Sequence, residues 1–114
     1  MSGMAAGGCQ LVLFTTGRGT PTGNPIVPVI KLSANRDTAV VMRDNLDFDA
    51  SGYLNGSTTM RQLRDALLEE ICAVAGGKLT RSEILGYCET AIARVGRYVK
   101  NEGEMKGCVE TYYY

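Results

Sequence analysis

Residues 11–25 of this chain read LVLFTTGRGTPTGNP, an apolar segment that runs directly into a loop rich in glycine and threonine. The apolar part has the continuous pattern of a strand buried on both faces, and we expect this strand over residues 10–16. In open α/β sheets, ligands bind at the carboxyl ends of the strands. The loop over residues 17–25 is therefore the first place to expect a binding site.

The groups in this loop are those that bind a planar anion. Glycines expose backbone amides, threonine hydroxyls donate hydrogen bonds, and a guanidinium forks onto a carboxylate or a phosphate. Glycine also lets the backbone approach a ligand closely. The alternatives are a structural arginine that satisfies loop carbonyls and β-branched residues that only end a strand. We predict six ligand-binding residues: Thr15, Thr16, Gly17, Arg18, Gly19 and Thr20.

The next segments continue the alternation of strands and helices. Residues 26–32 indicate a second strand, and its Pro28 predicts an edge strand or one that is paired on one side only at that point. Residues 38–45 indicate a short helix with Val40 and Val41 facing inward. Residues 46–50 alternate apolar and polar side chains and indicate a short third strand.

Two capping boxes mark the helices of the second half. Thr59 with Gln62, and Thr80 with Glu83, each have the spacing at which side chains satisfy free backbone amides at a helix start. The first helix should end at the Gly76-Gly77 pair. The second should continue through Val95, with Ile84, Cys88, Ala91 and Ile92 at helical spacing.

This order of elements predicts an α/β fold, a layered, Rossmann-like sheet with flanking helices. Residues 4–8 resemble the last turn of a helix with its glycine stop, so we expect a fragment of a longer protein. We place one domain over residues 1–100 and a flexible or docked tail over residues 101–114. The aromatic end of that tail is a candidate contact surface for a homo-oligomer.

Composition narrows the class of protein. The chain has 114 residues, which is the size of one domain, and its 12 basic and 12 acidic residues give zero net charge. The chain lacks the excess of basic residues that is typical of nucleic-acid-binding proteins, so we predict no nucleic-acid partner. No apolar run approaches the roughly 20 residues of a membrane span, and the first residues lack the pattern of a signal peptide. We expect a cytoplasmic protein that binds neither nucleic acid nor membrane.

The cysteines are scattered, and none forms a pair at C-x-x-C spacing. In a reducing compartment such residues are free thiols, and we expect most of them in the core, although an even count also allows two disulfides. The four residues are Cys9, Cys72, Cys88 and Cys108.

The chain contains no histidine, which limits its own chemistry. Histidine is the commonest transition-metal ligand and the side chain that most readily transfers protons near neutral pH. Lys31 is a weak candidate for a catalytic acid or base or for a second carboxylate contact. Asp47 and Asp49 have a spacing that could hold a metal, but a solvated strand face is the favoured interpretation, so we predict no metal ligand.

Several segments together resemble one family, the C-terminal part of the altronate/galactarate dehydratases. The resemblance covers residues 2 to about 85, and its most specific part is FTTGRG followed by the P-x-x-P-x-x-K pattern that ends at Lys31. The matching segments are SGMAAGG (2–8), LVLFTTGRGTP (11–21), NPIVPVIK (24–31), SAN (33–35), DFD (47–49), the helix from Met60, and GKLTRSE (77–83).

Membership would imply a carbon–oxygen lyase that dehydrates a sugar acid such as altronate or galactarate to a 2-keto-3-deoxy acid. A related branch releases sulfite from sulfolactate. The resemblance also implies a much longer enzyme that depends on a divalent metal, iron or manganese, whose ligands lie outside this chain. In that enzyme Arg18 would bind a substrate carboxylate, and the partners would be the sugar acid and the remaining domains. The alternative from the residues alone is a stand-alone module that binds an anion or a nucleotide.

Overall fold

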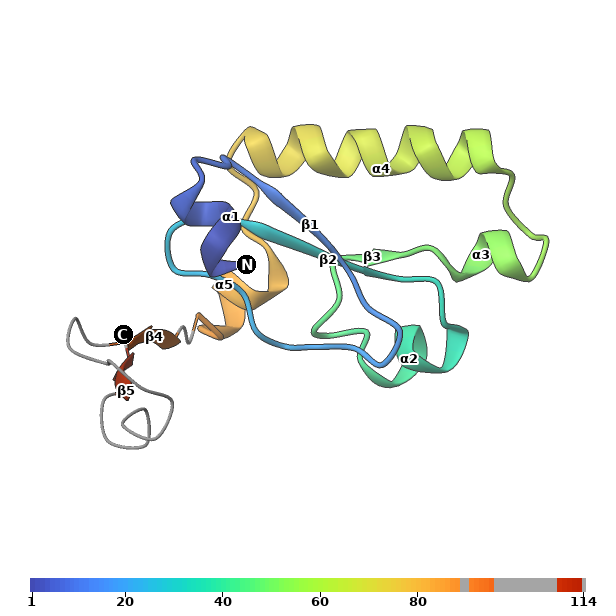
Figure 1. Ribbon diagram of the computed structural model, residues 1–114. Coiled ribbons are helices and arrows are strands. Elements are labelled where there is room, and N and C mark those ends of the chain that lie inside the picture. Colours follow the sequence, from blue (N-terminus) through green and yellow to red (C-terminus); the bar gives the residue numbers. More distant parts are fainter. Residues whose placement is uncertain (89–90, 96–108, 114) are drawn as a thin grey trace.

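The computed structural model describes residues 1–88, 91–95 and 109–113, the first of these ranges including side chains. Its elements are short, apart from one long helix, and Figure 1 shows their arrangement. In chain order they are α1 (Ser2–Ala6), β1 (Val12–Thr15), β2 (Val29–Ser33), α2 (Arg36–Val41), β3 (Phe48–Asp49), α3 (Ser51–Leu54), α4 (Met60–Ala75), α5 (Arg81–Leu85), β4 (Ala91–Val95) and β5 (Val109–Tyr113).

The first three strands form one parallel sheet with β2 in the centre. Val12 of β1 pairs with Val29 of β2, and Leu32 of β2 pairs with Phe48 of β3. In Figure 1, α4 runs along one side of these strands, while α2 and α3 lie beyond their carboxyl ends. The predicted α/β class is confirmed as a small parallel sheet with helices around it.

The core lies between α1 and the start of the sheet. Val12, Val27 and Val29 form a buried cluster, and Met1, Ala5 and Phe14 pack against it. Burying valines of this kind contributes roughly 1.5 to 3 kcal/mol per side chain. The predicted helical turn before β1 is therefore present as α1, and it covers the amino-terminal part of β1.

The sequence assigned the wrong positions to β1 and β2 within the sheet. β2 is the central strand, so the edge position, one of the two alternatives predicted from Pro28, is wrong. The other alternative agrees with the structure: Pro28 lies just before β2, where the described pairing is with β1 alone, and its carbonyl accepts a hydrogen bond from the Val12 amide at 3.0 Å. β1 is at the edge, and its Leu13 is 43% exposed. The prediction that β1 is buried on both faces is therefore also wrong for the described residues.

α2 begins two residues earlier than predicted, because the Asn35 side chain caps it by accepting the amides of Asp37 and Thr38. The buried residues of this helix are Thr38 and Ala39. Val40 and Val41, which we expected to face inward, are exposed.

Both capping boxes are confirmed. The Thr59 amide donates to Gln62 Oε1 at 2.9 Å, and the Thr80 amide donates to Glu83 Oε2 at 2.7 Å. α4 ends before the glycine pair, as predicted.

α5 is much shorter than predicted, because Gly86 ends it with a left-handed conformation (φ +72°). Ala91–Val95 is strand β4 and not helix, and it pairs antiparallel with β5, a strand that the sequence did not predict. The helix α3 was also not predicted from the sequence.

Two features of composition can be compared with the structure. Cys9, Cys72 and Cys88 are free thiols, but Cys9 and Cys72 are exposed, so the expected core position is wrong for both. Cys108 lies outside the described residues, as does most of the predicted tail. In the part of the chain that the structure describes, no helix has the length and apolar character to cross a membrane.

Candidate functional site

A cavity of about 680 Å³ lies at the carboxyl ends of β1 and β2. It is bounded by the segment that leaves β1, by the turn between β2 and α2, and by α3. This is the position at which open parallel sheets bind ligands. Ten residues line it: Thr15, Thr16, Gly17, Leu32, Ala34, Asn35, Arg36, Ser51, Leu54 and Asn55.

The segment that follows β1 is attached to α2 by two hydrogen bonds, which share one carbonyl as their acceptor. The Gly17 carbonyl accepts from Asn35 Nδ2 at 3.2 Å and from Thr38 Oγ1 at 2.8 Å. Thr16 continues the ladder through its amide, which donates to the Leu32 carbonyl at 3.0 Å. The segment after β1 is therefore attached to α2 as well as to β2, so the shape of the cavity is set before any ligand enters.

Three of the six predicted binding residues line this cavity, namely Thr15, Thr16 and Gly17. Arg18, Gly19 and Thr20 do not belong to its lining.

Gly19 has a different requirement. Its φ is +86°, and a side chain there would collide with the Met42 sulfur. Its amide donates to Thr16 Oγ1 at 2.9 Å. The described contacts of this glycine are thus within the protein, and a contact with ligand stays a prediction.

The sequence did not identify four polar residues of the cavity: Asn35, Arg36, Ser51 and Asn55. Arg36 is the first residue of α2, and Ser51 and Asn55 come from α3 and its end. The one available signal was the position of Arg36 directly after the cap residue of a helix that follows a strand. Nothing local marks Ser51 or Asn55, because only the fold brings α3 to β1.

Lys31, the weak catalytic candidate, lies in the centre of β2 with no exposed surface. Its Nζ donates to the Pro21 carbonyl at 2.7 Å, so it attaches the glycine-rich loop to the central strand. It does not line the cavity described above. These contacts give Lys31 a positioning task, while a catalytic role stays a prediction.

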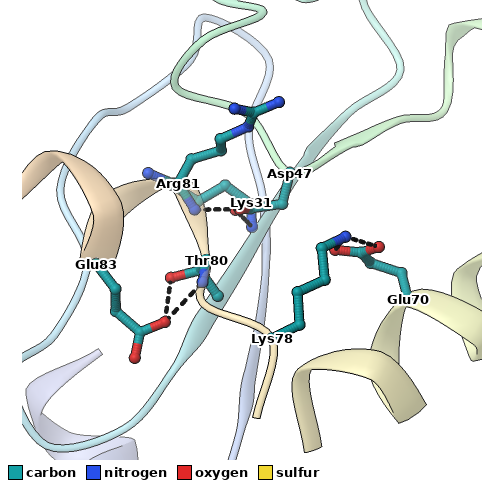
Figure 2. A network of polar contacts seen from close by, with 7 residues as sticks. All are labelled: Lys31, Asp47, Glu70, Lys78, Thr80, Arg81 and Glu83. Atoms are coloured by element: carbon teal, nitrogen blue, oxygen red, sulfur yellow. Dashed lines mark hydrogen bonds and ion pairs between the residues drawn. The ribbon is translucent and has the colours of Figure 1, made fainter. Parts of the chain in front are cut away.

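Asp47 lies beside Lys31 and connects three elements (Figure 2). Its Oδ2 accepts the Lys31 amide at 2.8 Å, and its Oδ1 accepts the Arg81 amide at 2.6 Å. The carboxylate therefore joins β2 and the start of α5 through the residue that precedes β3.

Burial lowers the pKa of Lys31 below its ordinary value, and the negative charges of Asp47 and Cys88 oppose that shift. With a lowered pKa, the folded protein releases this proton at a lower pH than the unfolded chain does. The unfolded state then binds more protons, so stability rises with pH from the lowered pKa up to about 10.4.

The replacement Lys31→Met should remove this pH dependence. We expect the difference in unfolding free energy, wild type minus variant, to increase from neutral pH towards about pH 10.4. Urea unfolding of both proteins at several pH values measures it, and groups that do not interact with Lys31 cancel in the difference. A difference that stays constant or falls with pH would contradict the assignment.

The carboxylates that could have held a metal are engaged otherwise. Asp49 Oδ1 accepts the Ser51 amide at 2.8 Å, and both oxygens of Asp47 accept backbone amides. Glu70 pairs with Lys78, with 2.6 Å between Oε2 and Nζ. Within the described residues no group of three or more histidine, cysteine, aspartate or glutamate side chains could hold a metal ion.

Asp47, Glu70, Lys78 and Arg81 share the lining of a second cavity of about 450 Å³ with Leu79 and Ile84. In Figure 2 the Lys78–Glu70 pair lies apart from Lys31, Asp47 and Arg81. Three of the four charged side chains of this second cavity are therefore engaged within the protein: Glu70 and Lys78 pair with each other, and Asp47 accepts two backbone amides.

The chain is thus an α/β domain with a cavity at the carboxyl edge of its parallel sheet, lined by polar residues together with Leu32, Ala34 and Leu54. Residues 1–98 match the family described as D-galactarate/Altronate dehydratase, C-terminal, and the chain belongs to that family. The resemblance seen in the sequence is therefore confirmed.

Relatives with names fall in both branches of this family. The (2R)-sulfolactate sulfo-lyase subunit beta of Chromohalobacter salexigens is 41% identical over 91 residues, 80% of this chain and 23% of the relative. Altronate dehydratase of Escherichia coli is 39% identical over 95 residues, 83% of this chain and 19% of the relative. Galactarate dehydratase (L-threo-forming) of the same organism is 38% identical over 73 residues, 64% and 14%. The chain spans about a fifth of the length of the first two relatives.

Proposed function

We propose that this chain is the C-terminal, substrate-binding portion of a metal-dependent sugar-acid dehydratase. The reaction removes water from an aldonate or aldarate, such as altronate or galactarate, and gives a 2-keto-3-deoxy acid. The observation that carries the proposal is the chemistry of the cavity. Hydroxyl, amide and guanidinium groups line it, and no carboxylate does, which suits an anionic substrate with many hydroxyls.

The elimination needs removal of a proton next to a carboxylate and departure of a β-hydroxyl. No lysine, cysteine, aspartate or glutamate lines the cavity, so its residues would bind and orient the substrate while another part of the enzyme supplies the base. The described residues also do not fit a metal site. We therefore propose that the divalent metal, iron or manganese, has its ligands elsewhere in the longer enzyme.

The surface supports an assignment to a longer enzyme. Large apolar side chains are exposed, with Ile26 at 80%, Val41 at 83% and Leu54 at 71%. The chain also spans only about a fifth of the length of the first two relatives, so much of a related enzyme would lie outside it. We propose that the remaining domains of the enzyme cover these positions.

A second candidate is the elimination of sulfite from sulfolactate, which the relative from Chromohalobacter salexigens favours. A sulfonate, like a carboxylate, is an anion that a guanidinium binds through several hydrogen bonds. The products separate the two candidates, because one reaction gives a keto acid with loss of water and the other releases sulfite.

The test is an assay of the enzyme that carries this chain with altronate, galactarate and sulfolactate. We expect keto-acid formation from a sugar acid, loss of that activity after chelation of the metal, and recovery with Fe²⁺ or Mn²⁺. The isolated chain should be inactive in the same assay. Sulfite release alone would select the second candidate.

Thermal shift of the isolated chain separates an enzyme domain from a stand-alone module. Stabilisation by nucleotides or phosphate, with none by sugar acids, would contradict the proposed function and favour the module.

A further inference from the structure

The first cavity carries one charged side chain, that of Arg36. No aspartate or glutamate is among its lining residues, so the local field favours an anion. Lining oxygens and nitrogens from threonine, serine and asparagine are neutral and suit hydroxyl groups. The cavity therefore has one anionic position and several positions for neutral hydrogen-bonding groups.

The backbone that carries Arg36 is fixed, while its guanidinium has no partner among the described residues. Arg36 follows the cap residue Asn35, whose side chain accepts two α2 amides and donates to the Gly17 carbonyl. Arg43 and Arg64, by contrast, form ion pairs with adjacent aspartates. An arginine with a fixed backbone and an unpaired, planar guanidinium can bind a carboxylate through two parallel hydrogen bonds.

One amide of the glycine-rich loop is engaged within the protein, and its arginine lies outside the cavity. The Gly19 amide is used by Thr16 Oγ1, and Arg18 does not line the cavity. Phosphate sites typically use several free backbone amides of such a loop. Within this cavity, Arg36 is therefore the charged group that a carboxylate would meet.

The opposite wall supplies groups for a hydroxylated carbon chain. Asn55 Oδ1 accepts the Ser57 amide at 3.0 Å, which leaves the Asn55 NH₂ group free to donate to a ligand oxygen. Ser51 adds a hydroxyl from the first turn of α3. Arg36 and these two residues come from different elements, so the cavity between them suits a ligand with a charged group at one end.

We propose that Arg36 binds a carboxylate of the polyhydroxy acid and that Ser51 and Asn55 bind its hydroxyl groups. The inference rests on the proposed function and assigns the substrate anchor within it. It replaces Arg18 with Arg36 as the principal carboxylate-binding residue.

The first experiment is kinetic and uses the enzyme that carries this chain. Arg36→Ala should raise KM for the sugar acid by about tenfold to a hundredfold and change kcat less, since a charged partner of the substrate is lost. Arg36→Lys should recover part of the loss, and added guanidinium should rescue Arg36→Ala alone. Arg61→Ala, an exposed arginine on α4 outside both cavities, is the matched control.

The second experiment measures binding without turnover, with the metal removed from every enzyme sample by chelation. Calorimetry with galactarate and with galactitol, its uncharged counterpart, should show that the wild-type protein prefers the acid and that Arg36→Ala loses this preference. Equal affinity of Arg36→Ala and Arg61→Ala for galactarate would overturn the assignment, as would a larger loss in Arg18→Ala. If the wild-type enzyme binds galactarate through Arg36 but forms no keto acid, the proposed function fails while the binding site stands.

Discussion

Replacing Asp47 with alanine is expected to lower the free energy of unfolding by about 3 to 5 kcal/mol. Both carboxylate oxygens accept backbone amides, from Lys31 at 2.8 Å and from Arg81 at 2.6 Å. A hydrogen bond to a charged group contributes about 1.5 to 3 kcal/mol, so the two bonds alone account for most of the loss. The substitution also removes the negative charge beside the buried Lys31. Urea unfolding near neutral pH measures the effect.

Asp49→Ala is the matched control, since it changes the same residue type two positions further along the chain. Asp49 is exposed and accepts one amide, that of Ser51, at 2.8 Å. We expect a loss of about 1 kcal/mol, since a single hydrogen bond at the surface is lost. If Asp47→Ala destabilises the protein no more than Asp49→Ala, the role of Asp47 in joining β2 to α5 is wrong.

The elements that the sequence predicts correctly are those set by contacts between near neighbours. The two capping boxes need only residues three positions apart, and the strand before the glycine-rich loop is marked by its own apolar run. α5 shows the limit of such patterns. Ile84, Cys88 and Ala91 keep helical spacing, yet one glycine in a left-handed conformation ends the helix at Leu85.

The candidate site was predicted in part for the same reason. Thr15, Thr16 and Gly17 follow β1 directly, so the position of a parallel strand places them at the carboxyl edge. Ser51 and Asn55 are more than 30 positions away in the chain, and only the pairing of β2 with β3 brings α3 to that edge. Lys31 shows a second limit. Lysine is rarely fully buried, and the residues next to it in the sequence do not indicate that its ammonium group donates to the Pro21 carbonyl.

The second large effect is expected from Gly23→Ala, which should destabilise the protein by about 2 to 3 kcal/mol through overpacking. Gly23 is buried where the glycine-rich loop meets α5, and its amide donates to the Tyr87 carbonyl at 2.6 Å. A Cβ at this position would lie 2.6 Å from the Ser82 Cβ and closer still to its hydroxyl oxygen. Ser82 is 1% exposed and close to Thr80, with 3.2 Å between the two hydroxyl oxygens, so it has little room to move. Thermal and urea unfolding report the loss.

Gly17→Ala in the same loop is the control, because its Cβ would meet no atom within 4 Å and Gly17 has no positive φ. We expect its unfolding free energy to change by no more than about 0.5 kcal/mol. A double-mutant cycle tests the contact itself: Ser82→Gly should destabilise the wild-type protein but cost less, or restore stability, when Gly23 is alanine. Additive effects of the two substitutions would show that steric contact with Ser82 is not the reason for a glycine at position 23. A non-additive cycle would mean that position 23 is glycine because the loop packs directly against Ser82 of α5.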